Sequence, residues 1–125
     1  IYDYHRVWVR RMQGNGTAGA PKFQLMFITG TDTMEDAVDA VSEFRIASFA
    51  DKIVCPFLIM HGAEDRQVTM QDAHEMYAAI ASTDKEMVVF DGPNGGAAHT
   101  QFDNHLPALQ VCADWMAAKL LPNAR

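Results

Sequence analysis

The chain has 125 residues, a formal net charge of −6 and a hydrophobic fraction of 49%. This composition is typical of a globular domain, and the acidic balance disfavours nucleic acid or an anionic membrane surface as the main partner. No apolar run approaches the roughly 20 residues needed to cross a bilayer, so no transmembrane helix is expected. Two cysteines, Cys55 and Cys112, are too few for a disulfide scaffold. They favour free, buried thiols in a reducing compartment such as the cytoplasm.

The first 52 residues predict short helices joined by loops. Apolar side chains at helical spacing predict a helix over residues 4–12. The apolar run Phe23–Ile28 fits neither a helix nor a strand clearly and stays unassigned. A threonine and an aspartate three residues apart open an amphipathic pattern that predicts a helix over about 33–45. We therefore expect residues 1–52 to form a cap-like or connecting helical segment.

Residues 53–125 predict the order strand, helix, strand, helix. The short apolar runs Phe57–Met60 and Met87–Phe90 have the character of buried strands, and an amphipathic helix opened by a capping pair lies between them. Asp103 is expected to cap the last helix. A strand–helix–strand connection of this length makes the two strands parallel.

Two parallel strands do not form a stable sheet, and parallel sheets need helices on both faces. The sequence therefore predicts an α/β fold in which this chain supplies the C-terminal βαβα portion of a larger parallel sheet. Because the sheet edge would be unpaired, we expect the isolated chain to fold poorly or to associate with itself as a homo-oligomer.

Two motifs point to ligands but meet their structural requirements poorly. Gly14–Gly19 matches the letters of the dinucleotide fingerprint, yet a charged segment precedes it and no helical pattern follows, so a plain loop is favoured. His99, Asp103 and His105, with Asp65, could be taken as a metal cluster, but their spacing matches no established ligand pattern. His61 is interpreted as a structural turn residue at the end of its strand.

Asp65 and His99 form a more informative pair. Asp65 follows the first predicted strand, and His99 lies in the glycine-containing loop after the second. Adjacent parallel strands bring these two loops to the same sheet edge, where the sites of open α/β sheets collect. A carboxylate that orients an imidazole is half of a nucleophile–base–orienter triad. The sequence therefore predicts a catalytic pair of Asp65 and His99.

These segments carry a resemblance to a known family. Residues 53–68, which include Met60-His61-Gly62-Ala63-Glu64-Asp65, resemble the acid-bearing strand and loop of α/β-hydrolases, and residues 95–104 resemble the histidine loop of one branch. That branch holds the fermentation-respiration-switch-like esterases, the dihydropseudooxynicotine hydrolase and fungal polyketide-shortening hydrolases. Residues 23–44 look like the stretch before the acid strand. The resemblance is specific over 53–121 and weaker over 23–52.

The resemblance implies a serine hydrolase that uses no cofactor and no metal. In the family the order is nucleophile, acid, histidine, and the nucleophile sits in a G-x-S-x-G turn before the acid. Ser42, Ser48 and Ser82 are not flanked in that way. The chain would thus supply Asp65 and His99 of a Ser-Asp-His triad, with the remaining N-terminal part of the fold as its partner and a small molecule as substrate.

The bond cleaved would be an ester or a carbon–carbon bond next to a ketone, and this chain alone is expected to be inactive. One alternative is a truncated, non-catalytic hydrolase-like segment that only packs against a partner. A nucleotide binder based on Gly14–Gly19 is the other alternative.

Overall fold

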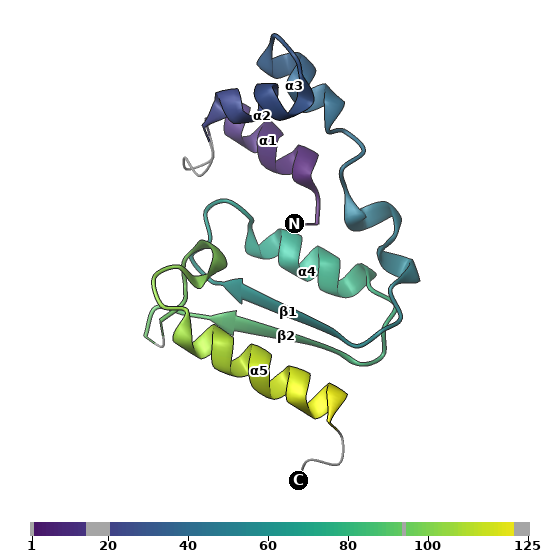
Figure 1. Cartoon of the computed structure of the whole chain (residues 1–125), viewed down its shortest axis with the longest axis vertical. Helices are drawn as coiled ribbons and strands as arrows, with labels where there is room; N and C mark the ends of the chain where they lie inside the picture. Colours follow the sequence, from purple (N-terminus) through teal and green to yellow (C-terminus); the bar gives the residue numbers. More distant parts are fainter. Residues whose placement is uncertain (1, 15–20, 94, 122–125) are drawn as a thin grey trace.

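The computed structural model describes residues 2–14, 21–93 and 95–121, and within them helices pack beside a two-stranded parallel sheet (Figure 1). The elements in chain order are α1 (Tyr4–Met12), α2 (Lys22–Thr29), α3 (Met34–Ala40), the short 3₁₀ helices η1 (Ile46–Ser48) and η2 (Ala50–Lys52), β1 (Phe57–Gly62), α4 (Met70–Ala79), β2 (Lys85–Phe90), the 3₁₀ helix η3 (His99–Gln101) and α5 (Leu106–Leu120). The α/β class and the predicted order of strands and helices after residue 53 are confirmed.

The sheet is built from a single strand–helix–strand unit. β1 and β2 run parallel, from the pair Phe57 and Lys85 to the pair Gly62 and Phe90. The connection passes through α4, which starts with the predicted capping box: Thr69 and Asp72 each accept a backbone N–H from the other. A buried cluster of Ala50, Ile59, Ala73 and Ile80 joins η2, β1 and α4. The connection through α4 returns the chain to the start of the sheet, so both strands end at the same edge.

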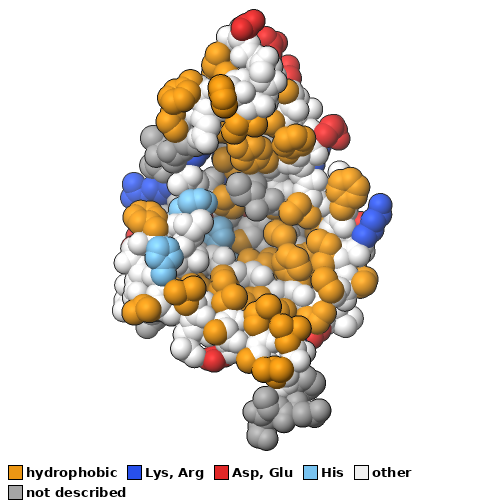
Figure 2. All heavy atoms as spheres, in the orientation of Figure 1, with side chains coloured by type: hydrophobic (Ala, Val, Ile, Leu, Met, Phe, Trp, Pro, Cys, Tyr) orange, Lys and Arg blue, Asp and Glu red, His pale blue; other side chains and the backbone are white. Residues whose placement is uncertain are grey.

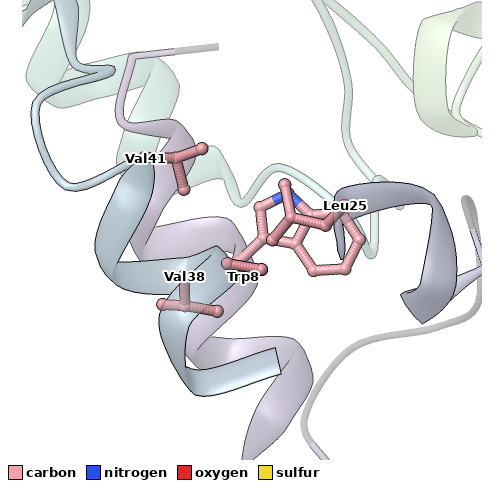
Figure 3. Packing of buried hydrophobic residues seen from close by; sticks show 5 residues of the cluster. Trp8, Leu25, Val38 and Val41 are labelled. Atoms are coloured by element: carbon pink, nitrogen blue, oxygen red, sulfur yellow. The ribbon is translucent and has the colours of Figure 1, made fainter. Parts of the chain in front are cut away.

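The three N-terminal helices form a second core around Trp8 (Figure 3). Trp8 from α1 packs with Leu25 from α2 and with Val38 and Val41 from α3 and its end. Trp8 and Leu25 are each 1% exposed, so these short helices are held by packing rather than by intrinsic helix stability. In Figure 1 this group lies beside the strand–helix–strand unit. The division of the chain between residues 52 and 53 stays a prediction.

Two helices of this N-terminal group differ from the sequence-based expectation. The unassigned run 23–28 lies inside α2, which ends at Gly30 in the left-handed conformation that suits glycine (φ 68°). The helix predicted over 33–45 stops at Ala40. It stops because residues 44–46 turn back to pair with the start of the chain: Tyr4 donates to the Phe44 carbonyl, and Ile46 donates to the Tyr2 carbonyl.

Ion pairs connect the N-terminal helices to α4. The carboxylate of Asp72, whose side chain is 1% exposed, accepts from Arg10 at 2.6 Å and from Arg6 at 3.1 Å. Arg6 also pairs with Glu75 at 2.6 Å. Burial raises the pKa of the Asp72 carboxyl, but hydrogen bonds from Arg10 and Thr69 outweigh it and leave the pKa below its ordinary value. Asp72 therefore belongs both to the capping box of α4 and to the ion pairs that connect α4 to α1.

A large part of one face is apolar and open to solvent. Figure 2 shows hydrophobic side chains spread over the region of the sheet and α5. In these elements, Leu109 and Leu120 of α5 are 62% and 68% exposed, and Val89 of β2 is 41% exposed. Both cysteines are free, but the prediction that they are buried is wrong, since Cys55 is exposed and Cys112 only half-buried. Within the described residues, no helix has the length and apolar character needed to cross a membrane.

Candidate active site

The two predicted site residues meet at one edge of the sheet. Asp65 follows the carboxyl end of β1, and His99 opens η3 in the loop after β2. Because the strands are parallel, both loops leave the sheet at the same end. Nδ1 of His99 lies 2.8 Å from Oδ2 of Asp65, which is hydrogen-bond distance. The structure therefore brings together the carboxylate and the imidazole that the sequence singles out.

The other oxygen of Asp65 is held by its own loop. Oδ1 accepts the backbone N–H groups of Gln67 at 2.8 Å and Val68 at 3.0 Å. The Asp65 side chain is 5% exposed, so burial without these bonds would be unfavourable for the charged carboxylate. With one oxygen fixed by backbone, the second points to His99. This carboxylate is thus preorganised to accept a hydrogen bond from the Nδ1–H group of His99.

The imidazole of His99 is oriented on one side and accessible on the other. Its side chain is 28% exposed, and among the described residues nothing forms a hydrogen bond with its Nε2. His99 lines an open hollow of about 280 Å³. The other residues that line it are Glu64, Arg66, Gln67, Ala98 and Phe102. When Nδ1 donates to Asp65, the Nε2 lone pair is free to accept a proton from a group in this hollow.

The histidine loop lies directly against the end of β1. Glu64 donates its backbone N–H to the Ala97 carbonyl at 2.9 Å. A Cβ atom at Gly62 would overlap the carbonyl oxygens of Ala97 and Ala98, so only glycine permits this close approach. Gly62 is the last residue of β1, and the sequence alone does not explain why it is glycine. The reason is the passage of the second loop over the first strand.

Asp103 has a different role from the one predicted. It does not cap α5, which begins at Leu106 after His105. Its carboxylate instead accepts the backbone N–H groups of Gly96, Ala97 and Ala98. These partners are amides of the preceding loop, and helical periodicity does not reveal them.

The interpretation of His61 as a turn residue is wrong. His61 lies inside β1 and is 7% exposed. Its Nε2 lies 3.1 Å from the carbonyl oxygen of Val68, at the end of the Asp65 loop. His61 is therefore a buried support of the acid loop. His74 in α4 and His105 before α5 are both exposed. Figure 2 shows some of the histidine side chains close together on the left of this face.

No serine of the described residues pairs with His99. Ser42 follows α3 and Ser48 ends η1, while the buried Ser82 exchanges hydrogen bonds with the backbone of Asp84. Within residues 2–14, 21–93 and 95–121, no three His, Cys, Asp or Glu side chains are grouped as metal ligands would be. The glycine motif considered for nucleotide binding falls, apart from Gly14, outside the described residues.

Comparisons with known proteins identify a family and a fold. The family model described as serine aminopeptidase, S33, matches residues 27–100, which is more than half of the chain and includes both Asp65 and His99. No curated protein matched the chain. The crystal structure of the 2,6-dihydroxy-pseudo-oxynicotine hydrolase superimposes with a TM-score of 0.68 at 24% identity.

That superposition covers 83% of this chain and 29% of the other chain, so the present sequence spans less than a third of the length of that hydrolase. At this identity the likeness shows the fold: a partial α/β-hydrolase. The match to the family model assigns a family as well as a fold, because it compares the sequence itself. The chain belongs to the serine aminopeptidase S33 family of α/β-hydrolases.

Proposed function

We propose that this chain provides the base and its orienting carboxylate in a serine hydrolase. The hydrogen bond between His99 Nδ1 and Asp65 Oδ2, at 2.8 Å, carries the proposal. Membership of a hydrolase family supports it. A preorganised carboxylate beside an accessible imidazole, at the carboxyl ends of two parallel strands, is the arrangement that a triad base and its orienter require.

In the proposed mechanism His99 acts first as general base and then as general acid. Asp65 accepts a hydrogen bond from the Nδ1–H group of His99, which fixes the tautomer in which Nε2 has a free lone pair. Nε2 removes the proton of a serine hydroxyl as the hydroxyl attacks the substrate carbonyl. The resulting imidazolium is stabilised by Asp65 and returns the proton to the leaving group. A water molecule then repeats the sequence and releases the second product.

The nucleophile of this mechanism is proposed to lie outside the 125 residues. None of the three serines of the chain has the Gly-x-Ser-x-Gly surroundings of a strand-to-helix nucleophile turn. The finer assignment of an ester, or of a carbon–carbon bond next to a ketone, belongs to this proposal, as does the cap-like role of residues 1–52. The chain alone is expected to hydrolyse no activated ester above a buffer blank, because it has a base without a nucleophile.

A comparison of histidine variants in the complete protein tests the proposal. His99→Ala should lower kcat for a p-nitrophenyl ester by several orders of magnitude with little change in KM, because the lost step is proton transfer. His74→Ala and His105→Ala are matched controls, since both side chains are exposed and neither contacts Asp65. Near-normal kcat in His99→Ala would contradict the assignment.

A further inference from the structure

The carboxylate of Asp103 gathers three consecutive backbone N–H groups. Oδ2 accepts from Gly96 at 2.9 Å and Ala97 at 3.1 Å, and Oδ1 accepts from Ala98 at 3.0 Å. Hydrogen bonds to a charged acceptor are stronger than neutral ones, and successive amides that converge on one anion form a nest. The Ala98 N–H, joined by those of Gly96 and Ala97, lowers the pKa of the Asp103 carboxyl despite partial desolvation.

The same three-residue segment leads directly into His99. The Ala98 N–H is bound by Asp103, and the next residue in the chain carries the imidazole. On its opposite side, the segment is bound by the Asp65 loop, because the Ala97 carbonyl accepts from Glu64. The position of His99 relative to Asp65 therefore depends on a short peptide that is fixed on both sides.

The residues after His99 show that the loop needs such fixation. Thr100 and Gln101 have positive φ angles of 54° and 56°, in a backbone region that residues other than glycine rarely occupy. Residues in such conformations persist only where the surrounding contacts determine them. Asp103 lies two residues after Gln101, and so it closes this turn onto segment 96–98.

From this arrangement we propose that Asp103 is a positioning residue for the histidine. By holding the amides of residues 96–98, its carboxylate sets the place of His99 against Asp65. The catalytic consequence rests on the function proposed above. Asp103 itself does not contact the hollow beside His99, so its effect is expected on the chemical step and not on substrate binding.

The test compares Asp103→Asn with two other variants in the complete protein. The amide keeps the shape of the side chain but removes the charge and places an NH₂ group against backbone donors. We expect kcat to fall about 10- to 100-fold with KM changed little, as for a catalytic group displaced by a fraction of an ångström. Asp103→Glu keeps the charge but displaces the carboxylate by one methylene group, so its kcat should lie between those of the wild type and Asp103→Asn. Asp114→Asn, at an exposed carboxylate bound to Gln110 within α5, should be unchanged.

A second readout follows the hydrogen bond directly. The proton between His99 Nδ1 and Asp65 should give a low-field NMR signal in the wild type and in Asp114→Asn. It should weaken and move upfield in Asp103→Asn and change less in Asp103→Glu. A wild-type signal without ester hydrolysis would refute the proposed ester hydrolysis but leave this test intact. Asp103→Asn with unchanged signal and kcat would overturn the positioning role; if that variant fails to fold, an unchanged Asp103→Glu would do so.

Discussion

Substitution of Asp72 should reveal how strongly the N-terminal helices are tied to α4. Asp72→Ala removes the partner of Arg10, one partner of Arg6 and the capping-box acceptor for Thr69. Breaking a fully buried pair costs about 3–5 kcal/mol. The arginine side chains are 24% and 37% exposed, so water compensates part of this loss. With about 1 kcal/mol for the capping interactions, the expected destabilisation is about 2–4 kcal/mol.

Urea denaturation of the complete protein, followed by circular dichroism, measures this loss. Asp72→Asn keeps an acceptor for Thr69 while it removes the charge, so it should be destabilised less than Asp72→Ala. Glu75→Gln is the control, because Glu75 is more exposed and Arg6 keeps Asp72 as its partner. If Asp72→Ala unfolds at the same urea concentration as the wild type, the ion pairs do not hold α1 to α4, and the reasoning from burial is refuted.

Three further predictions concern Gly62, Asp72 and Cys55. Gly62→Ala should lower the melting temperature and kcat together, since its methyl group would displace the Ala97 carbonyl; unchanged values of both would count against the close approach. The pKa of Asp72 is lowered in the folded state, so its stabilising contribution is complete above the ordinary carboxyl pKa and is lost as pH falls through the folded value. The stability difference between wild type and Asp72→Asn should therefore shrink on acidification, and a constant difference down to acid unfolding would refute this. Cys55 should react with a thiol reagent faster than Cys112, because it is the more exposed; equal rates would contradict the exposure.

The sequence predicted best what is encoded locally or by topology. The capping box of α4 links residues three positions apart, so Thr69 and Asp72 identified the start of the helix. The meeting of Asp65 and His99 could be predicted although they lie 34 positions apart in the chain. Parallel strands place successive loops at one sheet edge, and the two strands were recognisable as short apolar runs.

Features that depend on distant backbone groups could not be predicted. The end of α3 at Ala40 is set by pairing of residues 44–46 with residues 2–4, which has no local signature. Aspartate is a common N-cap residue, yet the partners of Asp103 are amides of a loop that precedes it in the chain. His61 was misassigned because an imidazole at a strand end is equally compatible with a turn and with a buried bond to a carbonyl.

Labelling with a fluorophosphonate tests the central claim most directly, because this reagent traps an activated serine. In the complete protein the label should map to one serine in a Gly-x-Ser-x-Gly sequence outside the present 125 residues. Its rate of incorporation should fall by orders of magnitude in His99→Ala and Asp65→Asn but not in His74→Ala. Label on Ser42, Ser48 or Ser82, or a rate that does not depend on His99, would contradict the assignment of Asp65 and His99 as the orienter and base of a serine hydrolase.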